Sequence, residues 1–213
     1  MVKPADFFVG MIDFFSVFLP GGMLTFVIYN NYQSFFFDVV PLEGGQLWVG
    51  FLFFSYLLGH IIYMIGARLD ILYDCHRRSR NPHTNELAFQ CTSAIKQKFL
   101  SGNENDSVNT FQWSISILTT QYPEAMMEIN RLVADQKFFR SLIVIIPLIS
   151  LVLLFNSDYF QAGVFSLLII PCYIRYYERR LKSTTRAYQY IIMLDGLGKL
   201  VPPKSDREKI TGY

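Results

Sequence analysis

Lysine and arginine residues alternate with four long apolar stretches along this chain, and this arrangement limits the folds available to it. The stretches contain no Lys or Arg and cover roughly residues 7–29, 47–67, 141–156 and 159–174. Of the 19 Lys and Arg residues, Lys3 precedes the first stretch, and the others lie between the second and third stretches or after the fourth. The two remaining loops, residues 30–46 and 156–158, carry only acidic charges. Because Lys- and Arg-rich loops stay on the cytoplasmic side of a membrane, the pattern predicts four spans with both termini inside.

The lengths of the stretches agree with this prediction. A span needs about 20 predominantly apolar residues; the first two stretches reach that length, whereas the last two are shorter and predict a tight hairpin. The alternative is a soluble protein with buried core helices, but burial in such a core gives no reason to sort the cations. The first stretch is too long for the apolar region of a signal peptide, and no cleavage site follows it, so we expect it to be retained. The predicted location is the bacterial inner membrane.

The predicted fold is all-α, a polytopic membrane protein with four transmembrane helices and cytoplasmic helical extensions. Along the chain we expect a first transmembrane hairpin (residues 1–67), a cytoplasmic helical region (68–139), a second hairpin (140–174) and a cytoplasmic C-terminal helix and tail (175–213). Within the cytoplasmic region, the spacing of apolar residues and breakers predicts helices near 84–100, 107–120 and 123–139. Pro20 predicts a kink or break in the first span, because proline lacks the N–H that would bond the Ser16 carbonyl.

Asp13 and His60 are the outstanding polar residues of the first two spans. Asp13 lies about 9 Å inside the first span at 1.5 Å per residue. His60 lies at a similar depth in the second span, so we expect the two side chains to be close, within one subunit or across a subunit contact. Ionisable groups inside a membrane face a bundle interior or a water-filled cavity. The pair is therefore either part of an ion pathway or a structural contact between two helices.

Three further residues, Ser16, Pro20 and Thr25, lie broadly on the same side of the first span as Asp13. Carbonyl groups exposed at a broken helix can line an ion path. The adjacent glycines, Gly21 and Gly22, can equally permit close helix packing. Both interpretations stay open from these residues alone.

Signatures of enzymes, cofactors and metal sites are missing from the sequence. Cys75-His76 is one adjacent pair, whereas a zinc site needs three or four well-spaced ligands. No glycine-rich phosphate loop, nucleophile elbow or HExxH motif occurs. The three cysteines, Cys75, Cys91 and Cys172, fall on or near the cytoplasmic side, so no disulfide is expected. No base-reading motif points to nucleic-acid recognition. We expect a protein without enzymatic activity, cofactor or metal.

Charged residues gather at the predicted inner membrane surface. Asp70 and Asp74 share a helix face and could hold a cation, but we expect them to pair with Arg68, Arg77 or Arg78 on a solvated surface. A cytoplasmic basic surface is predicted from Arg77, Arg78, Arg80, Arg175, Arg179 and Arg180. Topology and lipid attraction explain it, since each basic residue near anionic headgroups contributes about 1 kcal/mol. The alternative is a docking site for an anionic ligand or a cytoplasmic partner.

The segment Asp-Phe-Phe-Ser-Val-Phe-Leu-Pro-Gly at residues 13–21 resembles the opening of small bacterial inner-membrane proteins. Residues 58–60, 66–70 and 134–141 add to this resemblance. In layout the chain is similar to the membrane effectors of anti-phage defence operons, such as the Hailong and Kiwa membrane components. The resemblance implies a homo-oligomeric channel or sensor, with a tetramer as one candidate assembly. A cytoplasmic protein or a nucleotide signal would hold it silent, and its release would depolarise the cell.

The sequence thus favours an oligomeric membrane effector that forms an ion-conducting pore gated from its cytoplasmic helices, in bacterial antiviral defence. A four-span chain of this length has little room for a private transport pathway, so the pore would be shared between subunits. The first alternative is a non-conducting membrane anchor or scaffold that recruits a cytoplasmic partner. The second is a subunit that transports lipid or solute.

Overall fold

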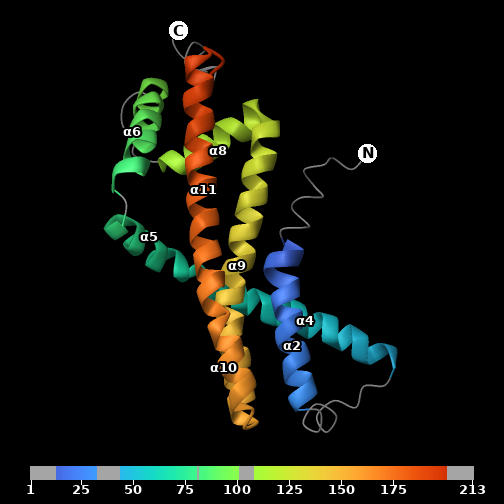
Figure 1. Cartoon of the computed structure of the whole chain (residues 1–213). Helices are drawn as coiled ribbons and strands as arrows, with labels where there is room; N and C mark the ends of the chain where they lie inside the picture. Colours follow the sequence, from blue (N-terminus) through green and yellow to red (C-terminus); the bar gives the residue numbers. More distant parts are fainter. Residues whose placement is uncertain (1–12, 33–43, 81, 101–107, 201–213) are drawn as a thin grey trace. The chain divides into compact units, whose positions relative to one another are not determined.

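The structure, a computed structural model of the chain, describes residues 13–32, 44–80, 82–100 and 108–200 (Figure 1). Side chains are described in all of these ranges except at residues 76–80 and 82–86. The described residues are almost entirely helical, and no strand occurs among them. For this part of the chain the all-α prediction is confirmed.

The chain divides into two compact units. The first consists of Met1–Arg78 and Asn130–Leu181, and the second of Ser79–Ile129 and Lys182–Tyr213. The helices of the first unit are η1 (Phe14–Phe18), α2 (Leu19–Asn31), α4 (Gly45–Ala67), α5 (Leu69–Arg80) and α10 (Tyr159–Leu167). Those of the second are α6 (Pro82–Phe99) and α8 (Thr110–Gln121). Two long helices, α9 (Pro123–Phe155) and α11 (Ile169–Gly196), contribute residues to both units, and the last two residues of α5 belong to the second.

Two helical stretches are long and apolar enough to cross a membrane, Gly45–Cys75 with 31 residues and Pro123–Phe155 with 33. Only 22% of the apolar window of the first is buried inside the chain, and 39% of that of the second. Large apolar side chains stand exposed on both, including Phe53, Met64 and Phe155 at 62%, 64% and 73% exposure. A helix in the core of a soluble protein would bury most of its apolar surface. These two helices therefore favour association with a membrane.

The other two predicted spans do not form single long helices in the described residues. The stretch 7–29 begins outside them, and its described part is a five-residue π-helix, η1, followed by the 13 residues of α2. The stretch 159–174 is divided at Leu168, where the backbone N–H bonds three residues back to Phe165 and ends the nine-residue α10. α11 then carries only a short apolar segment before its charged part begins. The structure thus has two clear span-length helices where the sequence predicts four.

The helices predicted for the middle of the chain are present as α6, α8 and the first part of α9. The third of them does not end near residue 139, because α9 continues through Pro147 to Phe155 as one helix of 33 residues. The predicted break at Pro20 takes another form. The backbone changes from π- to α-helical hydrogen bonding just before the proline, with the Leu19 N–H bonded to the Phe14 carbonyl.

Close backbone contact joins α2 and η1 to α4, which crosses them obliquely in Figure 1. A Cβ atom added at Gly21 would lie 1.9 Å from the Ser55 carbonyl oxygen, and one added at Gly59 would lie 2.2 Å from the Val17 carbonyl oxygen. Neither position can accept a side chain unless the helices separate. Small residues of this kind allow helices to pack closely in a lipid environment.

Within the first unit, the end of α2 lies beside the turn that follows α9. The side-chain amide of Asn156, in the turn after α9, donates to the Asn31 side chain at the end of α2, at 2.7 Å. Residues 140 and 156 of this helical segment are about 24 Å apart at 1.5 Å per residue. An apolar core formed by Leu24, Ile62, Ile145 and Ile149 lies among these helices. The turn at residues 156–158, which has no Lys or Arg, and Arg140 therefore lie at opposite ends of the apolar segment of α9.

The second unit has an apolar core of its own. Leu118, Ile129 and Ile191 are completely buried, and they come from α8, α9 and α11. The Lys96 ammonium donates to the Val108 carbonyl oxygen and so secures the start of the segment that leads into α8. These contacts make the helices of the second unit a packed body rather than independent extensions.

Candidate functional site

One carboxylate in the first unit is contacted by three side chains from two other helices. Asp70, at the start of α5, accepts a hydrogen bond from Arg140 Nη1 of α9 at 2.9 Å. Its other oxygen accepts the hydroxyl of Tyr176 on α11 at 2.7 Å. Arg180, one turn further along α11, forms an ion pair with that same oxygen. We call Asp70, Arg140, Tyr176 and Arg180 the Asp70 cluster.

Aromatic rings lie beside both arginines of the Asp70 cluster. The guanidinium carbon of Arg140 is 4.6 Å from the ring centroid of Tyr63 on α4, and that of Arg180 is 4.6 Å from the ring centroid of Tyr73 on α5. The Tyr73 ring in turn packs edge-on against Tyr176, with 6.0 Å between centroids. Cation–π contacts of this kind gain strength when the cation is shielded from water. The cluster thus joins α5, α9 and α11, and the Tyr63 ring connects it to α4.

Burial makes this cluster energetically important. The Arg140 side chain is 6% exposed, that of Arg180 is 18% exposed and that of Asp70 is 30% exposed. Removing such charges from water costs several kcal/mol per ion, and only good pairing compensates for it. Asp70 supplies that pairing for both arginines, and Arg180 has a second partner in Asp74 at 3.4 Å.

The hydroxyl of Tyr176 is held in its protonated form. Burial, and secondarily its hydrogen bond to Asp70, raises the pKa of Tyr176 well above its usual value. Tyr176 is therefore a permanent donor to the carboxylate at any physiological pH.

The described ion pairs of Asp70 and Asp74 are with Arg140 and Arg180, and none of them involves the predicted partner Arg68. The other two predicted partners, Arg77 and Arg78, lie outside the described side chains. Asp70 is 30% exposed, whereas Asp74, at 57%, lies on the solvated surface that the sequence predicted. Arg140 was not singled out by the sequence reasoning. The sequence did offer one sign of its role. Arg140 lies directly before the third apolar stretch, at the same predicted depth as Asp70, which follows the second.

The predicted basic surface is partly neutralised. Arg180 belongs to the Asp70 cluster, and Arg179 lies 3.5 Å from Asp135. Arg175 pairs with Glu178 at 3.2 Å but is 57% exposed. The side chains of Arg77, Arg78 and Arg80 lie outside the described side chains. In the described part, Arg175 is the most accessible of the predicted basic residues.

Ser16, Pro20 and Thr25 are buried in helix packing within one chain. The Ser16 carbonyl, which cannot bond to Pro20, accepts the Ser141 hydroxyl of α9 at 2.7 Å. The Thr25 hydroxyl donates to the Gly21 carbonyl of its own helix at 2.8 Å. Of the two interpretations left open by the sequence, these contacts favour close packing for the three residues.

Asp13 and His60 behave differently, because both are exposed in the single chain. No hydrogen bond or ion pair joins them among the described contacts, so the expected contact is not seen within one chain. The His60 ring packs edge-on against Tyr56 of its own helix, with 4.5 Å between ring centroids. His60 lies midway along the apolar stretch Gly45–Cys75. A polar ring thus stands on the outer face of an apolar helix.

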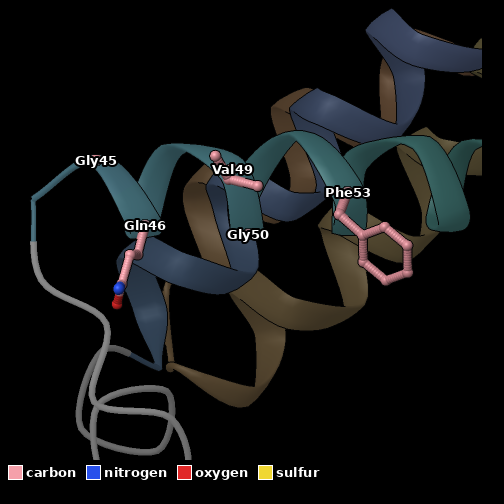
Figure 2. A pocket seen from close by; sticks show the side chains of 5 residues that line it. All are labelled: Gly45, Gln46, Val49, Gly50 and Phe53. Carbon is pink, nitrogen blue, oxygen red and sulfur yellow. The ribbon is translucent and has the colours of Figure 1, made fainter.

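The same outer face of α4 carries an open apolar depression near the start of the helix. It is lined by Gly45, Gln46, Val49, Gly50 and Phe53, whose side chains are drawn in Figure 2. The glycines leave the backbone uncovered, and the lining includes no ionisable group. The depression therefore has no side chain that could bind a charged ligand or take part in a reaction.

Within the described residues, no three His, Cys, Asp or Glu side chains gather closely enough to hold a metal ion. No known protein family matches the chain, and neither a curated protein nor a solved structure is significantly similar to it. Two features of the described residues therefore bear on function: the buried Asp70 cluster and the exposed polar residues of an apolar surface.

Proposed function

We propose that the chain is a four-span inner-membrane protein with both termini in the cytoplasm, and that several copies assemble into an ion-conducting pore. The cytoplasmic helices gate this pore. Its biological setting is antiviral defence, a proposal that depends on the resemblance of residues 13–21 and of the general layout to anti-phage membrane effectors. A cytoplasmic protein or a nucleotide is the expected regulator.

Charge and geometry support the four-span topology together. The hydrogen bond between Asn156 and Asn31 joins the two loops that contain no Lys or Arg. About 24 Å of helix separates residue 156 from Arg140, close to the thickness of a hydrocarbon core of about 30 Å. α2, α10 and the start of α11 would complete the bundle around the two span-length helices.

The observation that carries the pore is the exposure of His60. It stands on the uncovered face of α4 together with Phe53, Tyr56 and Met64, all of which are more than half exposed. Ionisable residues in spans avoid lipid and face protein or a water-filled cavity. A neighbouring subunit or a shared lumen would supply that environment for His60 and for Asp13.

The Asp70 cluster is the candidate link between the pore and its regulator. It ties α5, α9 and α11 to one another where the apolar segment of α9 begins. Both α9 and α11 continue into the second unit. A signal that moved either helix would therefore act on the buried ion pairs, which are costly to separate.

Ion flux in liposomes tests the proposal. Purified protein is reconstituted with a potassium gradient, and the gradient is followed at several pH values. We expect wild type to dissipate the gradient, His60→Leu to conduct severalfold less, and Met64→Leu on the same face to conduct like wild type. A wild-type gradient that persists at every pH, with the regulator absent, contradicts conduction.

Topology has a separate test. In a chain whose native cysteines are replaced by serine, Asn156→Cys should react with an impermeant maleimide added outside intact spheroplasts. Arg175→Cys should react only after lysis. Equal labelling of both positions would contradict the four-span arrangement.

A non-conducting anchor is the second candidate function. It is favoured by the burial of Ser16, Pro20 and Thr25, since residues packed inside one chain do not line a shared lumen. An anchor would leave the potassium gradient intact and would still retain a cytoplasmic partner at the membrane.

A further inference from the structure

We propose that the chain binds a phosphate group at the Nε–Nη2 edge of Arg140, between α4 and α9. Arg140 is 5% exposed, and its Nη1 is taken by Asp70. Nε and Nη2 are both buried and have no hydrogen-bond partner within the described residues. The proposal depends on the proposed membrane placement only for the source of the phosphate, which would be an anionic lipid headgroup.

The free atoms of Arg140 suggest the class of ligand. Nε and Nη2 form one edge of the planar guanidinium group, and two parallel N–H groups on such an edge match two oxygens of a phosphate or carboxylate. Asp70 occupies the other side through Nη1. A buried donor pair without an acceptor is unusual in proteins, so this edge requires an acceptor that the described side chains do not provide.

Lys137 and Arg140 both lie near the ring of Tyr63. The Lys137 ammonium is 5.8 Å from the Tyr63 ring centroid, and the Arg140 guanidinium carbon is 4.6 Å from the same centroid. Among the described side chains, Lys137 forms no ion pair with a carboxylate and the Tyr63 hydroxyl makes no hydrogen bond. Lys137 and the Tyr63 hydroxyl are therefore the candidate donors for the remaining oxygens of an anion bound by Arg140.

Gly66 packs directly beside the donor edge. A Cβ atom added there would lie 3.4 Å from both Cγ and Nε of Arg140. That is a contact distance, so an added methyl group would cover the edge of the guanidinium group with little displacement. Gly66 is therefore the position at which the site can be closed without removing a charge.

The position of the site favours a phospholipid over a carboxylate of a protein partner. Arg140 directly precedes the apolar segment of α9, where lipid headgroups would meet the helix. Arg140, Arg180 and Lys137 carry three positive charges against the two of Asp70 and Asp74, which leaves one cation in excess. Basic pockets between spans on the cytoplasmic side bind phospholipid headgroups.

Lipid retention in native mass spectrometry tests the proposal. The full chain in neutral detergent and phosphate-free buffer is offered equal amounts of phosphatidylglycerol and phosphatidylcholine. We expect wild type to retain phosphatidylglycerol in preference. Gly66→Ala and Lys137→Gln should each weaken this retention about tenfold, as expected for losing a charge-assisted hydrogen bond. Matched controls are Gly163→Ala, where an added Cβ meets no atom within 4 Å, and Lys98→Gln on the exposed surface of α6.

A second arm uses inorganic phosphate to identify the source. If phosphate alone raises the Tm of wild type and displaces phosphatidylglycerol, and Gly66→Ala abolishes both effects, the site is supported with free phosphate as its ligand. If phosphate has no effect but the lipid preference depends on Gly66, the headgroup is the ligand. Absence of both effects, or a Gly66→Ala variant that binds like wild type, overturns the proposal. Because binding is measured in detergent, a chain that conducts no ions still gives a decisive result.

Discussion

Replacing Asp70 with asparagine removes the carboxylate that Arg140 and Arg180 share while keeping the shape of the side chain. Arg140 then stays buried, at 6% side-chain exposure, without a carboxylate among its described contacts. Arg180 keeps Asp74 at 3.4 Å, and Tyr176 can still donate to the amide oxygen of the new side chain. The main effect of the substitution is therefore the loss of charge compensation for Arg140.

The expected cost follows from burial. Breaking a buried ion pair by removing one partner costs about 3–5 kcal/mol. Asp70 is 30% exposed and Arg180 retains a partner, so the lower end of that range, about 3 kcal/mol, applies. In a chain of this length each kcal/mol moves the Tm by about 2–4 °C. The expected fall for Asp70→Asn is therefore about 6–12 °C.

Thermal unfolding of purified protein in neutral detergent measures this effect, and Asp135→Asn is the matched control. Asp135 pairs with Arg179 at 3.5 Å, with both side chains about one-third exposed. Such a pair contributes about 0–1 kcal/mol, so the control should lose no more than about 4 °C. In the double variant Asp70→Asn with Arg140→Gln, no unpaired buried charge remains, and the loss should be smaller than the sum of the single losses.

Equal Tm values for Asp70→Asn and Asp135→Asn would refute this reasoning. The arginines would then be hydrated in the folded protein, and the Asp70 cluster would be an ordinary surface network. Strict additivity in the double variant would likewise contradict a direct interaction between Asp70 and Arg140.

Three further predictions concern stability. Gly21→Ala should cost about 3 kcal/mol or more, because the new Cβ would lie 1.9 Å from a backbone oxygen of α4. The control is Gly22→Ala, whose Cβ would make only an ordinary contact at 3.8 Å and should change the Tm little. Equal effects of the two substitutions would contradict the close crossing of α2 and α4. Ser141→Ala should cost about 0.5–1.5 kcal/mol by removing the buried hydrogen bond to the Ser16 carbonyl, and a Tm equal to that of wild type would contradict this. The hydroxyl of Tyr190 donates a hydrogen bond to Glu128, and this bond raises the pKa of Tyr190. The stability that the bond contributes is therefore present below about pH 10 and is lost as pH rises through the folded-state pKa. The Tm of wild type should therefore fall more steeply than that of Tyr190→Phe above about pH 10, and parallel curves would contradict the prediction.

The fold was predictable where local signals agree over long segments. The apolar run 141–156 and Pro123 predicted both ends of α9, although the sequence suggested two elements where the structure has one. No breaker stands between residues 123 and 146, so nothing local stops the helix at the expected boundary near 139. The π-helical turn before Pro20 was not predictable, because it depends on how the chain rearranges hydrogen bonds around a missing donor.

The candidate site was predictable only in part. Ser16, Thr25 and His60 could be named from the sequence as polar residues in apolar segments. Which of them faces outward depends on where α4 crosses α2, and that crossing is set by Gly21 and Gly59. Helical spacing within one segment cannot give this information, since it fixes the relative directions of side chains but not the neighbour on each side.

The order of apolar and cationic segments by itself determines that this chain is helical and suited to a membrane, because lipid excludes charge and requires every backbone group to be bonded within its own segment. Only the tertiary structure decides that Asp70 pairs with Arg140 and with Arg180, which lie 70 and 110 positions further along the chain. Ion pairs between helices depend on the rotation of each helix about its axis. That rotation is set by packing between helices at a few small residues. It cannot be predicted from the sequence of one segment alone.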